Sequence, residues 1–306
     1  MRLALDLALL AGALGLMWIV PDQLAFLTRV LIMILLVLSL DLVVGFAGIA
    51  TLGQAAMFGS GAYAAALFAL HVSAEPLSGL VVGMAAAAGV AFVSGLALLR
   101  AKALTLLVLT IAVAEVLQEV ANQADTVTGG ADGLGGYLMA PLLGAEFDLW
   151  GRTGYLYALG VLALCFAFAR RLAGSPLGLA LRGIREAPDR MHALGTPVYW
   201  RLVTVYTLAG GLAGAAGALS AQTTELVSPA AFDFSLSAEA LIMLILGGTG
   251  RLYGAILGTV LFMAVHHFAA AVDPFNWLFA IGALVLAVVF LAPAGLVSLA
   301  DRWVRR

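Results

Sequence analysis

Charged residues are scarce in this sequence. Asp, Glu, Lys and Arg make up 10% of the 306 residues, against about 25% in an average soluble domain, and 63% of the residues are hydrophobic. A soluble core could not bury so much apolar surface. Because a membrane span needs about 20 predominantly apolar residues, ten spans would take up about 200 positions and leave only short connections. The composition therefore predicts a single transmembrane domain over residues 1–306.

Lysine is almost absent, which excludes one way of binding a nucleotide. Lys102, between Ala101 and Ala103, is the only lysine. A phosphate-binding P-loop needs a lysine within the pattern G-x-x-x-x-G-K-[ST], so this chain has no such loop and we expect no directly bound cofactor. The clusters Gly59-Ser-Gly61 and Gly247-Gly-Thr-Gly250 match only fragments of nucleotide-binding motifs and are interpreted as helix breaks.

Cysteine, histidine and basic residues are too few or too dispersed for several other functions. Cys165 is the only cysteine, which excludes an internal disulfide and a metal site built on cysteines. His266 and His267 are adjacent, so on a helix they point about 100° apart and do not suit a shared metal site. A net charge of −2 without a basic patch excludes nucleic-acid binding. No paired acid and base at a plausible spacing indicates an enzyme.

Long apolar runs fill most of the chain and predict an all-α polytopic membrane protein. The first run, after Arg2, is longer than the apolar part of a usual signal peptide and is interpreted as a retained span. About ten transmembrane helices are expected, at residues 3–20, 24–44, 55–71, 77–99, 103–121, 155–172, 202–221, 236–246, 252–271 and 275–291. The eighth is too short to cross unless it includes neighbouring residues.

The positions of the positive charges predict the orientation in the membrane. With the N-terminus inside, 13 of the 15 Lys and Arg residues fall on the cytoplasmic side, and only Arg29 and Arg152 fall outside. Both termini are therefore expected in the cytoplasm. Two long connections follow from this arrangement: a cytoplasmic loop at 173–200 and a periplasmic loop at 122–153, each a plausible docking surface for a partner.

Glycine spacing predicts close packing between helices. Gly210 and Gly214 lie four residues apart, as do Gly250, Gly254 and Gly258, so each set shares one helix face where backbones can approach. Ten spans would also suit an inverted repeat of five plus five, as in many transporters. The Gly-rich breaks at 45–61 and 247–258 do not occupy matching positions in the two halves, which gives this repeat little support.

Four carboxylates fall within the predicted spans. A charged group at the centre of a membrane helix costs about 2.5–3.5 kcal/mol on insertion scales, so such groups usually face the bundle interior or a wet cavity. They either make structural hydrogen bonds or line a solute path, and both interpretations stay open for Asp41, Glu115, Glu119 and Glu239.

Four groups of motifs, taken in order, resemble a known family. They are Asp41-Leu-Val-Val-Gly-Phe-Ala-Gly48 with Thr51-Leu-Gly-Gln54 and Phe58-Gly-Ser-Gly-Ala-Tyr63; Thr128-Gly-Gly-Ala-Asp-Gly133; Ser175-Pro-Leu-Gly-Leu-Ala-Leu-Arg182 with Ile184-Arg-Glu186; and Leu246-Gly-Gly-Thr-Gly-Arg-Leu-Tyr-Gly254. This series is similar to the LivM-type permeases of branched-chain amino acid ABC importers, whose wider family also serves sugars and urea. The resemblance covers nearly the whole chain.

The resemblance implies that residues 182–195 form a coupling helix that docks on a cytoplasmic ATPase. Its candidate coupling residues are Arg182, Arg185, Glu186, Asp189, Arg190 and Gly195. A charged segment exposed between two spans suits that role, and Gly195 is expected to end the helix. Pro188 departs from the family pattern and fits only in a first helical turn, so the helix is expected to begin later than in relatives.

The resemblance also implies the remaining sites and partners of a permease subunit. Candidate residues of the translocation path are Asp41, Gln54, Phe58, Tyr63, Glu115, Glu239, Gly247 and Gly248, and candidates for docking a periplasmic binding protein are Thr128, Gly129, Gly130, Asp132 and Gly133. The expected partners are a second, LivH-like permease, two cytoplasmic ABC ATPases that hydrolyse ATP, a periplasmic solute-binding protein and membrane lipid. The expected location is the bacterial inner membrane. The alternative is an ion-coupled secondary transporter.

Overall fold

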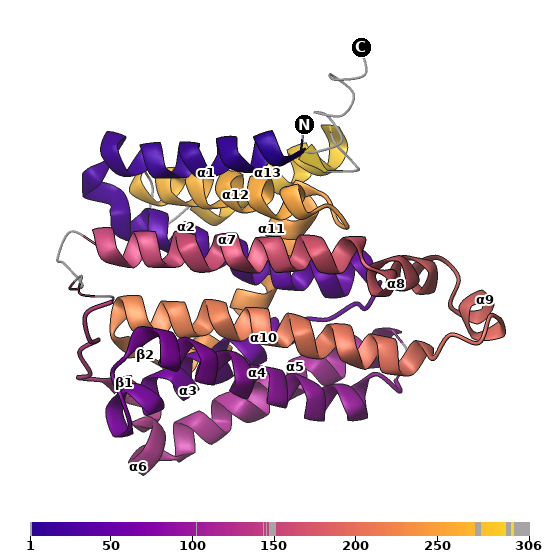
Figure 1. Ribbon diagram of the computed structural model, residues 1–306, viewed down its shortest axis with the longest axis horizontal. Coiled ribbons are helices and arrows are strands. Elements are labelled where there is room, and N and C mark those ends of the chain that lie inside the picture. Colours follow the sequence, from indigo (N-terminus) through magenta and orange to yellow (C-terminus); the bar gives the residue numbers. More distant parts are fainter. Residues whose placement is uncertain are drawn as a thin grey trace.

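A helix occupies each of the ten predicted apolar segments in the computed structural model (Figure 1). The structure describes residues 2–101, 103–142, 144, 146, 151–272, 277–291 and 295–296. Lys102 and the C-terminal residues, including Arg302, Arg305 and Arg306, lie outside the described residues, and so does the predicted cytoplasmic C-terminus. The ten helices are α1 (Arg2–Ile19), α2 (Leu24–Leu40), α3 (Gln54–His71), α4 (Pro76–Leu98), α5 (Ala103–Gln123), α7 (Arg152–Gly174), α10 (Val198–Thr224), α11 (Phe234–Gly247), α12 (Leu252–Val272) and α13 (Trp277–Leu291).

Among the residues that the structure describes, six helical segments are long and apolar enough to cross a membrane. They are Pro21–Phe46, Pro76–Leu98, Leu104–Gln123, Arg152–Gly174, Val198–Thr224 and Leu252–Val272. These segments support a multi-pass helical membrane protein. Helix α11 has 14 residues, fewer than the about 20 that a span needs, in line with its short apolar run. That the chain crosses the membrane ten times, and that it contains an inverted repeat, stay predictions.

The connections between the long helices gather at two opposite ends of the molecule (Figure 1). One end carries α8 (Pro176–Glu186) and α9 (Pro188–Ala193), which project beyond the long helices. The other end carries α6 (Asp125–Thr128) and an antiparallel pair of short strands, β1 (Leu134–Gly135) and β2 (Leu226–Val227). The loops at 173–200 and 122–153 therefore lie at opposite ends, as their assignment to opposite sides of a membrane requires.

The segment at 182–195 forms parts of two helices, so the prediction of a single helix is wrong. Helix α8 begins at the N-cap Ser175, whose hydroxyl accepts a hydrogen bond from the N–H of Gly178 at 3.3 Å. It ends before Ala187, which has φ −154° and ψ 80° because a residue that precedes a proline disfavours the helical region. Pro188 then starts α9, as expected for a first-turn proline.

The end of α9 agrees with the expected role of Gly195. This residue has φ 77°, a left-handed conformation in which glycine is favoured. Its N–H bonds to the carbonyl of His192 at 3.0 Å, and the N–H of Thr196 bonds to the carbonyl of Met191 at 3.1 Å. This pair of bonds is a Schellman motif, which satisfies carbonyls that the helix end would otherwise leave free.

Helix α10 forms the centre of the closest packing in the molecule. It packs mainly against α4 and α3, which also pack against each other. Small residues allow this approach: a Cβ added at Gly214 would overlap Ala87 and lie 2.8 Å from the carbonyl oxygen of Gly83. The same holds at Gly210, beside Ala91. The predicted close packing at this glycine pair is confirmed, since there is no space for larger side chains.

Candidate functional site

Three chain segments meet at the end of the molecule that carries α8. They are the π-helical segment Asp41–Phe46 that continues α2, the connection between α11 and α12, and α8 itself. Asp41 has no exposed surface, and its Oδ1 accepts a hydrogen bond from the N–H of Gly250 at 2.6 Å. A Cβ at Gly45 would overlap both of these atoms. Glycine at position 45 therefore allows the π-helical end of α2 to meet the segment before α12 through Asp41.

Two arginines of α8 reach this junction. The Nη1 group of Arg185 donates a hydrogen bond to the carbonyl oxygen of Gly45. The guanidinium of Arg182 lies 5.0 Å from the centre of the Phe46 ring, within range of a cation–π interaction. Together with Glu186 and the α11–α12 connection, these residues line a cavity of about 400 Å³. Helix α8 is thus connected directly to the π-helical end of α2.

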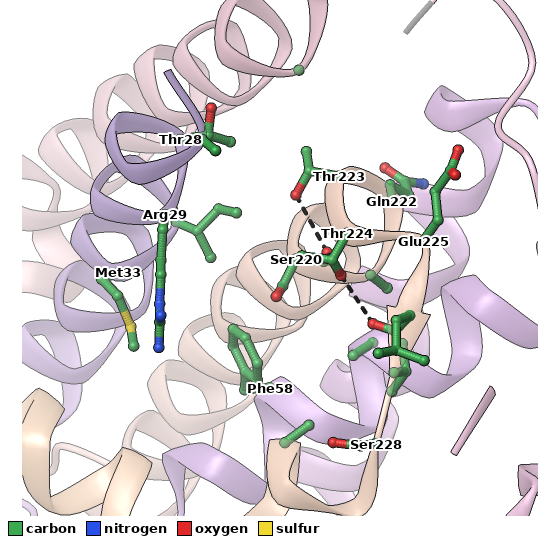
Figure 2. A pocket seen from close by; sticks show the side chains of 18 of the residues that line it. Thr28, Arg29, Met33, Phe58, Ser220, Gln222, Thr223, Thr224, Glu225 and Ser228 are labelled. Atoms are coloured by element: carbon green, nitrogen blue, oxygen red, sulfur yellow. Dashed lines mark hydrogen bonds between the residues drawn. The ribbon is translucent and has the colours of Figure 1, made fainter. Parts of the chain in front are cut away.

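A larger cavity, of about 550 Å³, lies between α2 and the end of α10 that is followed by β2 (Figure 2). Figure 2 shows Arg29 and Met33 on α2 along one side, Ser220, Thr223 and Thr224 on α10 across from them, and Phe58 of α3 between the two. Hydroxyl groups are frequent in its wall, which includes Thr28, Ser220, Thr223, Thr224 and Ser228. The volume lies within the range of about 300–1,000 Å³ typical of ligand pockets.

Charge is distributed unequally over the walls of this cavity, which we call the outer cavity because it lies at the end of the molecule opposite α8 (Figure 1). Arg29 is the one Lys or Arg among the described residues that line it. The opposite wall holds Glu225 and the C-terminal end of α10. Because carbonyl groups point out of a helix C-terminus, that end carries about half a negative charge. The cavity is therefore positive on the α2 side and negative on the α10 side.

Glu225 has a backbone conformation that is unusual for its side chain. Its φ of 53° lies in the left-handed region, where a residue other than glycine is strained by about 1–3 kcal/mol. Its Oε1 accepts a hydrogen bond from the N–H of Met139 at 3.2 Å. Glu225 therefore joins the end of α10 to the chain that follows β1, and it keeps this wall of the outer cavity in place.

The structure separates the residues predicted for a translocation path. Phe58 lines the outer cavity, whereas Asp41 lies at the junction with α8. Gln54 is buried beside Ser39, and Tyr63 is buried with its ring stacked 5.6 Å from that of Phe232. These four residues therefore do not form one continuous lining.

The other predicted path residues also have separate environments. Glu115 is exposed on α5, and so is Glu119 one turn later. Glu239 on α11 is half-buried and lies within electrostatic range of Arg29. Gly247 packs against the backbone of Gly254, and Gly248, with φ 107°, ends α11. Of these residues, Glu239 is the one that lies near Arg29, the charged residue on the α2 side of the outer cavity.

The Gly-rich segment predicted to dock a binding protein forms a compact turn at the same end as the outer cavity. Gly129, Gly130 and Gly133 all have φ between 59° and 77°. The hydroxyl of Thr128 donates to the carbonyl of Ala121 at 2.6 Å. Three glycines are therefore needed for backbone shape, and the exposed Asp132 is the residue whose side chain is available to a partner.

Arg29 was not among the site residues predicted from the sequence. Its signal was present, since Arg29 and Arg152 are the two arginines that the charge distribution placed outside. Arg29 also follows Leu24 by only five residues in a helix that has no other charged residue. Periodicity could not reveal that this face of α2 lies opposite the end of α10, because Ser220 at that end is 191 residues after Arg29 in the chain.

Comparisons with known proteins show the family of this chain. The family model described as the permease component of the branched-chain amino acid transport system matches residues 23–292. The chain is 29% identical to the high-affinity branched-chain amino acid transport system permease protein LivM of Escherichia coli K12, and 30% identical to that of Salmonella typhimurium LT2. Each match covers 89% of this chain and 69% of the relative. No solved structure matches significantly. The chain therefore belongs to the permease family of branched-chain amino acid transport systems.

Proposed function

We propose that this chain is a membrane-spanning subunit of an ATP-driven importer for branched-chain amino acids or a related small polar solute. The observation that supports this most strongly is the family match over residues 23–292, which includes both the outer cavity and the junction with α8. We infer an alternating-access mechanism in the bacterial inner membrane. The chain works as a transport subunit, and separate ABC ATPases hydrolyse the ATP.

The position of α8 and α9 supports docking of the ATPase at these helices. They project at one end of the molecule (Figure 1), and the side chains of Glu186, Asp189 and Arg190 are exposed there. Arg185 instead extends back to the carbonyl of Gly45. In this proposal α8 receives the movement of the ATPase and Arg185 transmits it to the inner ends of α2 and α12.

The opposite end supports delivery of solute by a periplasmic binding protein. The turn at Thr128 to Gly133 and the outer cavity lie at this end, together with β1 and β2. We infer that the binding protein contacts this turn through Asp132 and releases its solute nearby. A second, LivH-like permease completes the path, in a heterodimer with two ATPases.

Dependence of transport on the ATPases tests this function. The complex is reconstituted into vesicles with its binding protein, and uptake of radiolabelled leucine is measured. We expect uptake to fall at least tenfold when the P-loop lysine of both ATPases is replaced, because this chain has no P-loop. Undiminished uptake with the inactive ATPases would contradict the proposal.

One observation favours the ion-coupled alternative, and the same vesicles test it. Within the described residues, the Oδ2 atom of the buried Asp41 has no hydrogen-bond partner, which suits a group that binds a proton. An ion-coupled transporter would accumulate leucine under an imposed proton gradient without any ATPase. We expect no accumulation under that condition.

A further inference from the structure

We propose that Arg29 binds the carboxylate of an amino-acid-sized solute in the outer cavity. The inference rests on the proposed transport function and goes beyond it by assigning a binding residue and an orientation of the solute. It follows from the position of one cation, the polarity of the opposite wall and the apolar residues between them.

Arg29 has binding capacity that the described part of the chain does not use. Its guanidinium offers five N–H donors, yet it makes no hydrogen bond there and no ion pair within 4 Å. The side chain is exposed, in a largely buried helix that has no other charged residue. Arginine is the side chain best suited to bidentate binding of a carboxylate, and such charge-assisted bonds are about twice as strong as neutral ones.

The opposite wall suits an ammonium group. It consists of the C-terminal end of α10, with its partial negative charge, and Glu225. The hydroxyls of Thr223 and Thr224 already donate to backbone carbonyls, at 2.7 Å to Leu219 and 2.7 Å to Ser220. Their remaining lone pairs can accept bonds from an ammonium. A zwitterion in the cavity is therefore expected to turn its carboxylate toward α2 and its ammonium toward α10.

Apolar residues of the wall provide a surface for an aliphatic side chain. Ile32 and Met33 follow Arg29 along α2, Phe58 comes from α3, and Leu236 comes from α11. Each buried CH₂ group contributes about 0.8 kcal/mol, so a branched aliphatic group would bind here more tightly than a small polar one.

A structural role as the counter-ion of Glu239 is the main alternative for Arg29. Glu239 is within electrostatic range, but the two side chains do not form an ion pair within 4 Å. Replacing Glu239 with glutamine separates the two roles. If Arg29 binds solute, Glu239→Gln leaves the preference for a carboxylate intact, whereas a counter-ion role predicts the same loss from either variant.

The test measures binding to the purified full chain. Thermal unfolding in detergent is followed with L-leucine, with leucinamide, which lacks the carboxylate, and with 4-methylpentanoate, which lacks the ammonium. We expect leucine to bind at least tenfold more tightly than leucinamide. In Arg29→Gln, leucine affinity should fall at least tenfold with no change for leucinamide, and Arg29→Lys should retain part of the affinity. Arg152→Gln removes an arginine at the same end but outside the cavity, and should bind leucine normally.

Three outcomes would overturn the assignment: equal stabilisation of the wild-type chain by leucine and leucinamide, unchanged leucine affinity in Arg29→Gln, or no stabilisation by leucine at all. Failure of this assignment can be distinguished from failure of the proposed function. The vesicle experiment tests whether transport needs the ATPases, whereas leucine binding that depends on Arg29 requires no ATPase. If Arg29→Gln yields less folded protein, the binding measurement is made on Arg29→Lys, which keeps the charge.

Discussion

Alanine at Gly217 is expected to lower the free energy of unfolding of the chain by about 3 kcal/mol. A Cβ at this position of α10 would overlap the carbonyl oxygen of Phe58 and lie 2.8 Å from its carbonyl carbon and 3.0 Å from the nitrogen of Ala62. These are backbone atoms of α3, so no side-chain rotation can relieve the overlap. Overpacking a core by one methyl group usually costs about 1–3 kcal/mol, and we expect the upper end of that range here.

The measurement is thermal unfolding in detergent, monitored by the size-exclusion peak of the folded chain. Gly160→Ala in α7 is the matched control, because a Cβ there meets no atom within 4 Å. It should stabilise the chain slightly, since an alanine loses less chain entropy than a glycine when a helix forms. Equal melting temperatures for Gly217→Ala and Gly160→Ala would show that α3 and α10 are not packed as described.

Alanine at Arg185 is expected to reduce uptake at least tenfold while the ATPases stay bound. The substitution removes the hydrogen bond from α8 to the carbonyl of Gly45. Without it, movement of α8 is no longer transmitted to the buried contact between Asp41 and Gly250. We therefore expect ATP hydrolysis to continue without solute transport, because the lost bond lies within this chain and not at the ATPase.

Two other arginines make this prediction specific. Arg190→Ala, on the exposed surface of α9, should weaken copurification of the ATPase as well as uptake. Arg171→Ala, in the last turn of α7, should affect neither. Uptake is measured in vesicles, and ATPase retention by affinity purification of this chain. If Arg185→Ala transported normally, the role assigned to the contact with Gly45 would be wrong.

The sequence predicted where the helices lie, with errors mainly at polar ends. The segment predicted at 252–271 is observed as Leu252–Val272, whereas the one at 202–221 extends over Val198–Thr224. Tyr199, Trp200 and Thr223 lower the hydropathy at the ends of α10 but continue its helix. The π-helical segment after Leu40 was not predicted, because its residues are as apolar as those of an α-helix and differ only in hydrogen bonding.

The candidate site could be predicted only in part. The motif around Asp41, Gly45 and Gly250 was recognised from the resemblance, and the structure brings these three residues into one junction. The resemblance also implied that Arg185 acts at the ATPase, whereas its guanidinium extends to Gly45. Arg182 and Arg185 are three residues apart and share one face of α8, but their spacing does not determine whether that face meets a partner or the end of α2.

Composition and the order of apolar runs by themselves determined that this is a helical membrane protein without a P-loop, because lipid requires each span to satisfy its own backbone hydrogen bonds. Those properties are local to each segment. Only the tertiary structure decided that Arg29 faces the end of α10 and that Asp41 bonds to Gly250, 209 positions later. Such contacts depend on which helix faces pack together, and in this chain that depends on glycines such as Gly45 and Gly217, where any side chain would separate the backbones.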